Sequence, residues 1–101
     1  MKIKEFFQSV NKNDLDEIKN TDKELIDYDK ESFDDYFVST FLYKLKDGYY
    51  CYMAISNKEE SRSNLLNKKF NDLEKANIYY NELHILAIGG DLYKIKEKLE
   101  K

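Results

Sequence analysis

Two runs of aromatic and β-branched residues, joined by a short turn sequence, constrain the fold of this chain most strongly. The first run covers residues 36–45, the second covers 49–55, and Lys46-Asp47-Gly48 lies between them. An Asp-Gly pair favours a tight hairpin because both residues tolerate positive backbone φ angles, which match the twist of the flanking strands. The sequence therefore predicts an antiparallel β-hairpin with a two-residue turn at Asp47-Gly48.

This turn pairs residue 45 with 50, 43 with 52 and 41 with 54, and directly opposed residues share a face of the sheet. One face then holds Phe37, Phe41, Tyr43, Leu45, Tyr50, Tyr52 and Ala54. The other face holds Val38, Thr40, Leu42, Lys44, Lys46, Tyr49, Cys51, Met53 and Ile55. Both faces are apolar away from the turn. Either helices cover both faces, or part of one face is open for a partner.

Helical elements are expected before the hairpin. Residues 3–10 place their apolar side chains on one side of a short amphipathic helix. Asn13 is a suitable N-cap for a second short helix. Thr21-Asp22-Lys23-Glu24 matches a capping box, which predicts a further helical turn through Tyr28.

A third strand and two helices are expected after the hairpin. Residues 64–70 fit a weak edge strand. Asn71-Asp72-Leu73-Glu74 favours the start of a helix capped by Asn71, whose apolar stripe continues to Ala87. Gly89-Gly90 ends this helix and Asp91 caps a last one. The chain is therefore predicted to form a single small α+β domain over residues 1–101. Its parts are an N-terminal helical segment, an antiparallel hairpin with two or three strands, and two C-terminal helices packed on the sheet.

The sequence lacks the side-chain combinations that mark common enzyme and metal sites. His84 is the single histidine and Cys51 the single cysteine, and no spacing of zinc ligands is present. Residues 27–31 have the alternating acids with which a calcium loop begins, but Ser32 and Val38 stand where that loop needs glycine and glutamate. We therefore expect a protein that is not an enzyme and that holds neither a metal nor a cofactor.

Cellular location follows from the cysteine count and from hydropathy. A single cysteine cannot form an intrachain disulfide, which suits a reducing cytoplasm. The longest strictly aliphatic run, Ile85 to Ile88, has four residues, which is far too short to span a membrane. Of the 17 basic residues only Arg62 is arginine, and this lysine bias follows AT-rich codons, as in low-GC bacteria and their phages and mobile elements.

Charge is distributed unevenly along the chain. Ten acids against three lysines leave residues 14–35 seven units negative, so the remainder of a chain of net charge −3 is positive by four. The acids are Asp14, Asp16, Glu17, Asp22, Glu24, Asp27, Asp29, Glu31, Asp34 and Asp35. One interpretation is a solvated face that keeps a small domain dissolved. The other is a surface that mimics the charge of a nucleic-acid backbone and is steered onto a basic groove.

Tyrosine is the second unusual component, with nine residues in the chain. Tyrosine is enriched at binding hot spots because it offers a large contact area at low cost in rotamer entropy. We therefore predict a non-catalytic inhibitor of phage or mobile-element origin that blocks a basic nucleic-acid-binding surface of a defence protein, such as a CRISPR effector or a restriction enzyme. The predicted partner-binding residues are Asp14, Asp16, Glu17, Asp22, Asp27, Asp29, Glu31, Asp34, Asp35, Tyr43, Tyr49, Tyr50 and Tyr52.

Two other functions remain open at this point. An immunity protein or antitoxin that neutralises a toxic nuclease would use the same surface on a different target. A regulatory module would instead bind nucleic acid through the hairpin and the basic C-terminal helix. A single arginine and few basic clusters disfavour direct nucleic-acid binding. An unpaired hairpin edge also permits a homodimer.

Overall fold

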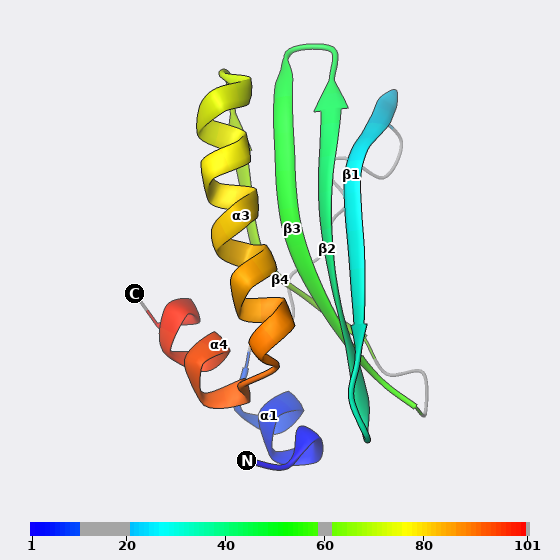
Figure 1. Ribbon diagram of the computed structural model, residues 1–101, viewed down its shortest axis with the longest axis vertical. Coiled ribbons are helices and arrows are strands. Elements are labelled where there is room, and N and C mark those ends of the chain that lie inside the picture. The colour runs from blue at the N-terminus through cyan, green and yellow to red at the C-terminus, as the bar shows by residue number, and fades with distance from the viewer. Residues whose placement is uncertain (11–20, 59–61, 101) are drawn as a thin grey trace.

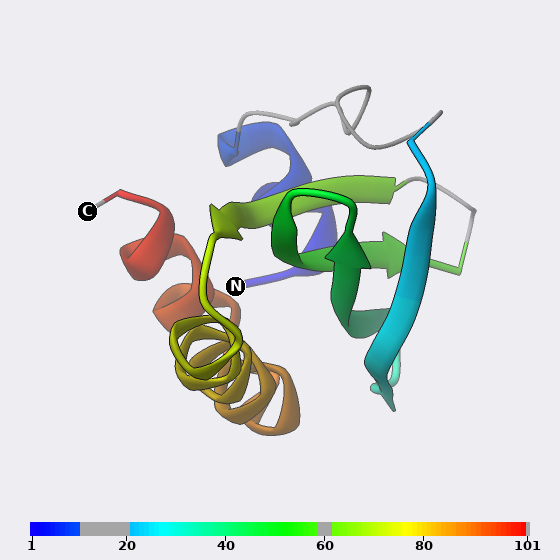
Figure 2. The ribbon, with the colours of Figure 1, turned by 90° about the horizontal axis from the view of Figure 1, so that it is seen from above.

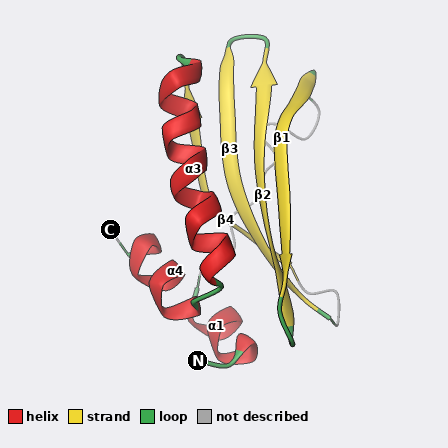
Figure 3. Cartoon of the chain, viewed as in Figure 1, coloured by secondary structure: helices red, strands yellow, loops and turns green. Residues whose placement is uncertain are grey.

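A four-stranded antiparallel sheet and helices packed on it make up the part of the chain that the computed structural model describes, residues 1–10, 21–58 and 62–100. The strands follow the chain order β1-β2-β3-β4, so β1 and β4 are the outer strands. In sequence the elements are α1 (Ile3–Ser9), β1 (Lys23–Ser32), β2 (Tyr36–Leu45), β3 (Gly48–Asn57), β4 (Arg62–Phe70), α3 (Leu73–Gly89) and α4 (Leu92–Leu99). Figure 3 shows the helices beside the twisted sheet.

The predicted α+β class is confirmed, but the predicted strand count is wrong because β1 was expected to be helical. Residues 23–32 pair with β2 along almost their whole length, with one irregularity between Leu25 and Asp27. The capping-box pattern favours a helix only through contacts among neighbouring residues. Pairing with β2 supplies backbone hydrogen bonds along the ten residues of β1, and such tertiary pairing overrides local helix propensity. The second short helix expected after Asn13 lies outside the described residues.

The hairpin of β2 and β3 is confirmed, with its turn one residue earlier than predicted. Leu45 pairs with Gly48, so Lys46-Asp47 forms the turn and each β3 residue meets a β2 residue two positions earlier than expected. A shift of two residues preserves the faces, because side chains alternate with a period of two. Glycine is needed at position 48 because β4 passes close to it, and not because of the turn. A Cβ atom at Gly48 would lie 2.6 Å from the Phe70 carbonyl oxygen.

The main core lies between one face of the sheet and the helices. Its largest fully buried side chains are Phe6, Leu42, Met53, Ile55, Leu65, Leu83 and Ile95. Helix α3 packs against β2 and β3, while α4 and α1 lie together near its C-terminal end (Figures 1 and 2). A second, smaller cluster on the opposite face contains Leu45, Tyr50, Tyr52 and Ala54, with Phe41 and Tyr43 packed against it. In the described part of the chain, no helix has the length and apolar character needed to cross a membrane.

Capping residues set the ends of α3 and α4. Asp72, not the predicted Asn71, caps α3, where its carboxylate accepts a 2.7 Å hydrogen bond from the Glu74 N–H. Gly90 ends α3 in the left-handed conformation at φ 61°, as a helix C-terminus favours. The predicted cap of α4 is confirmed, since Asp91 accepts hydrogen bonds from two N–H groups of the first turn.

Candidate functional site

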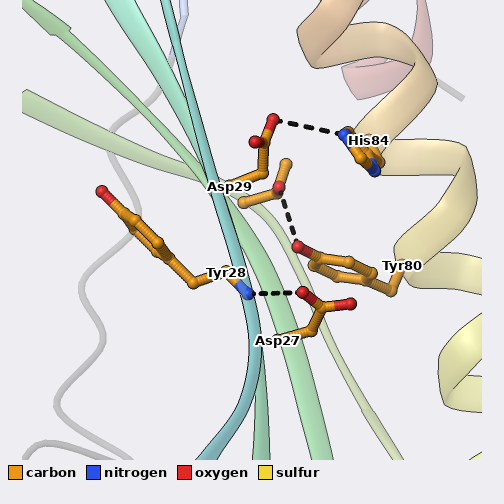
Figure 4. A network of polar contacts seen from close by, with 6 residues as sticks. Asp27, Tyr28, Asp29, Tyr80 and His84 are labelled. Atoms are coloured by element: carbon orange, nitrogen blue, oxygen red, sulfur yellow. Dashed lines mark hydrogen bonds and ion pairs between the residues drawn. The ribbon is translucent and has the colours of Figure 1, made fainter.

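The outer strand β1 turns a row of carboxylates toward α3. Asp27, Asp29 and Glu31 are two residues apart and therefore point to the same side of the strand. Their partners on β2 are Leu42, Thr40 and Val38, all three of which are buried in the main core. Figure 4 shows Tyr28 on the opposite side of β1 from His84 and Tyr80 of α3.

Asp29 meets His84 of α3 at this junction. The Asp29 Oδ2 atom lies 3.2 Å from the His84 Nε2 atom, with 30% and 37% of the two side chains exposed (Figure 4). This distance suits an ion pair when the imidazole is protonated, but the contact lacks hydrogen-bond geometry. The Asp29 Oδ2 atom is shielded from solvent and accepts no hydrogen bond. The carboxylate oxygen therefore faces the imidazole without being satisfied by it.

Glu31 completes a three-residue group at this junction. One ligand atom from each of Asp29, Glu31 and His84 lies within 4.8 Å of the others. The pKa of Glu31 is raised from its ordinary value, first by a hydrogen bond with the Asp29 side chain and then by desolvation and the Asp29 charge, while His84 opposes the shift. Two carboxylates and one imidazole thus share a small volume between β1 and α3.

A buried hydrogen bond holds α3 against β2 beside this group. The Thr40 hydroxyl donates to the Tyr80 hydroxyl oxygen over 3.3 Å. Tyr80 lies one helical turn before His84, and the centroids of their rings are 6.1 Å apart. Burial raises the pKa of Tyr80 above its ordinary value. This contact positions the part of α3 that carries His84.

The acids predicted to bind a partner gather along β1 and the turn that follows it. Asp22, Asp27, Asp34 and Asp35 are exposed, whereas Asp29 and Glu31 are partly buried toward α3. Asp14, Asp16 and Glu17 lie outside the described residues. Between described residues, Lys69 pairs with Asp47, Lys98 with Glu82 and His84 with Asp29, and of these acids Asp29 belongs to the predicted group.

The predicted tyrosine anchors are not all available on one surface. Tyr43, Tyr50 and Tyr52 share the face that points away from α3, while Tyr49 packs against the main core. Tyr50 and Tyr52 are only 5% and 6% exposed, and the Tyr52 ring stacks on Phe41 at 4.4 Å. These two rings are therefore already covered in the folded chain.

Sequence reasoning missed three exposed apolar residues of β1. Leu25, Ile26 and Tyr28 are 50%, 42% and 45% exposed. They were assigned to a helical turn, so their place beside the acids could not be recognised. The alternation of Asp27, Tyr28 and Asp29 has the period of two that marks a strand, and it was the pattern that could have found them.

The Cys51 thiol is buried and protected from reaction. Its side chain is fully buried in β3, and the thiol donates a 3.4 Å hydrogen bond to the Ala76 carbonyl oxygen. Burial raises the pKa of Cys51 to about 12, so the reactive thiolate is not populated at neutral pH.

Comparisons of the chain with protein-family models, with curated proteins and with solved structures found no match. The function proposed next rests on the charge, exposure and contacts of the described side chains.

Proposed function

We propose that this chain binds the basic, nucleic-acid-binding surface of a larger protein and blocks it stoichiometrically, without turnover. The observation that carries the proposal is the gathering of exposed acids on an outer strand. We call this surface the acidic edge and define it as Asp22, Glu24, Asp27, Asp34 and Asp35, on and beside β1. Residues 22–35 contain seven acids against two lysines.

The charge density of the acidic edge suits steering toward a basic groove. Alternate residues of a strand are about 6.6–6.8 Å apart, whereas one strand of duplex DNA carries one phosphate per ~3.4 Å. Asp27, Asp29 and Glu31, the alternate acids of β1 of which Asp27 belongs to the acidic edge, thus have about half the linear charge density of a single DNA strand. Such a surface accelerates encounter with a cationic groove and makes the affinity dependent on salt.

Exposed apolar side chains beside the acids provide the contact that excludes water. Leu25, Ile26 and Tyr28 lie between acids along β1. Leu25 and Tyr28 point to the face of the strand opposite Glu24 and Asp27, so a groove that receives the outer edge of β1 contacts both sets of side chains. The Tyr28 ring packs on Phe41 with 5.0 Å between centroids, which holds one side of the ring in place while 45% of the residue stays exposed. A rigid half-exposed aromatic ring beside charges is the arrangement found at interface hot spots.

The class of target follows from the chemistry of the surface. A protein that holds nucleic acid in a positively charged groove offers the complementary charge, and occupation of the groove excludes the nucleic acid. CRISPR effectors and restriction enzymes have such grooves. So do toxic nucleases, for which the same contact would make the chain an immunity protein or antitoxin.

A displacement assay tests the proposal on all three target classes. A labelled duplex or guide complex is bound to each purified effector, restriction enzyme or nuclease, and its release by this chain is followed by fluorescence anisotropy. We expect release from at least one target at a one-to-one ratio, with an affinity that falls as salt is raised. The proposal would be overturned if the chain released nucleic acid from none of the three target classes.

Matched charge variants locate the surface. Neutralising three acids of the edge, in E24Q/D27N/D35N, should weaken inhibition by about threefold to a hundredfold, since each exposed ion pair at an interface contributes about 0.2–1 kcal/mol. The control E74Q/E97Q/E100Q changes the net charge by the same amount at exposed acids of α3, of α4 and of the α4 C-cap. Equal losses in the two variants would show that overall charge, and not the acidic edge, determines binding.

A further inference from the structure

Two structural elements bring three potential metal ligands together at the junction of β1 and α3. Asp29 and Glu31 come from the strand, and His84, the one histidine of the chain, comes from the helix. An imidazole nitrogen with two carboxylate oxygens is a donor set that Zn²⁺ and similar divalent transition ions accept. A purely oxygen-based set would instead favour Mg²⁺ or Ca²⁺.

The distances between the ligand atoms suit a metal centre. Bonds of about 2.0–2.1 Å at a tetrahedral angle place two ligand atoms ~3.3 Å apart. The Asp29 Oδ2 and His84 Nε2 atoms are already 3.2 Å apart. All three ligand atoms lie within 4.8 Å, so Glu31 has to approach by at most about 1.5 Å, which rotation about its side-chain bonds provides.

The environment of the Asp29 carboxylate also favours a cation. Its Oδ2 atom is shielded from solvent and accepts no hydrogen bond, although it faces the His84 ring. A shielded carboxylate oxygen that accepts no hydrogen bond is costly. A metal ion between the oxygen and the imidazole would satisfy both at once.

The surroundings hold two of the ligands in place. Asp29 belongs to the strand pair with β2, opposite the buried Thr40. The His84 ring lies near the Tyr80 ring. Tyr80 is held in place by the buried hydrogen bond that the Thr40 hydroxyl donates to its hydroxyl oxygen. The site is therefore built on rigid elements and needs only the Glu31 side chain to move.

We infer that Asp29, Glu31 and His84 form a binding site for one Zn²⁺ ion, which links the outer strand β1 to α3. Three protein ligands leave a fourth coordination position for water or for a ligand from a partner. The bound ion stabilises the folded chain, because it ties together ligands that the unfolded chain keeps far apart. This inference is independent of the proposed inhibition.

Isothermal titration calorimetry of the full chain with ZnCl₂ at pH 7.5, after treatment with EDTA, tests the site. We expect one ion per chain, a melting temperature that rises with Zn²⁺ concentration, and no comparable effect of MgCl₂. The variants D29N and H84Q should each weaken binding by about tenfold or more. The control D27N changes a neighbouring acid on the same side of β1 and should retain full affinity.

A second measurement covers the case in which a variant fails to fold. The imidazole ¹⁵N resonances of wild-type His84 should shift on addition of one equivalent of Zn²⁺, with the larger change at Nε2. Absence of Zn²⁺ binding, unchanged His84 resonances, or full affinity in folded H84Q would each overturn the inference.

Discussion

Replacing Gly90 with alanine tests how the C-terminus of α3 is held against the turn between β1 and β2. Gly90 has φ 61°, and a Cβ atom there would lie 2.3 Å from two ring atoms of Phe33. The Tyr36 hydroxyl donates a hydrogen bond to the Gly90 carbonyl oxygen, and the Phe33 and Tyr36 rings stack at 5.0 Å. Gly90 thus joins the C-terminal end of α3 to the turn that follows β1.

The expected loss of stability has two components. A left-handed conformation costs an alanine about 1–2 kcal/mol. Moving the Phe33 ring away from the new methyl group disturbs its packing on Tyr36, an aromatic pair that contributes about 0.5–1.5 kcal/mol beyond area burial. We therefore expect Gly90→Ala to lower the free energy of unfolding by about 2–3 kcal/mol. That corresponds to a fall of about 10–20 °C in the melting temperature of a domain this size.

The adjacent glycine provides a matched control. Gly89 is the last residue of α3, and a Cβ there would meet no atom within 4 Å. Gly89→Ala should therefore leave stability unchanged or raise it by up to about 1 kcal/mol, as alanine is the better helix former. Thermal unfolding followed by circular dichroism measures both variants. A melting temperature of Gly90→Ala within about 2 °C of the wild type, or equal losses in both variants, would refute this reasoning.

Three further predictions concern buried polar groups. Tyr80→Phe should lower the free energy of unfolding by about 1 kcal/mol in urea denaturation, because it leaves the Thr40 hydroxyl without its partner, whereas the exposed Tyr93→Phe should change nothing. Cys51 should react with thiol reagents at pH 8 only after unfolding, because its thiol is buried. Stability should fall between pH 9 and 12, since burial raises the pKa of Cys51 from 9.0 to about 12 and that of Tyr79 from 10.0 to about 12. In that range the unfolded chain has released protons that the folded chain still holds.

Each of these predictions has an outcome that contradicts it. Equal stability of Tyr80→Phe and the wild type would mean that the buried hydroxyl pair contributes nothing. Rapid modification of native Cys51 would show that β3 opens readily. For the alkaline loss of stability, Cys51→Ala is the diagnostic variant, and a loss as steep as in the wild type would assign the effect to other groups.

Local patterns in the sequence were sufficient for the elements with short-range determinants. The alternation of apolar residues in 36–55 predicted the hairpin, and the caps around α3 and α4 were correct to within one residue. The turn moved by one position because Gly48 is required by a contact with Phe70, which is 22 residues away in the sequence. Such a contact leaves no trace in the turn sequence itself.

Long-range pairing explains what the sequence could not reveal. The helical capping pattern at 21–24 is satisfied locally, and only the pairing with β2 makes 23–32 a strand. The concentration of acids was visible in the sequence. Which of these acids are exposed to solvent and which face α3 depends on the side of β1 to which each side chain points. The contact of Asp29 with His84 joins residues 55 positions apart and could not be predicted while 21–28 was assigned to a helix.

Hydrogen–deuterium exchange on the complex with the target found in the displacement assay tests the central claim most directly. The outer strand β1 and the following turn, residues 22–35, should exchange more slowly in the complex, while α3 should be unchanged. Helix α3 offers the rival surface, since Ile78, Ile85 and Ile88 are 58%, 71% and 56% exposed. Slower exchange confined to α3 and α4, with 22–35 unchanged, would contradict the claim that the acidic edge is the binding surface.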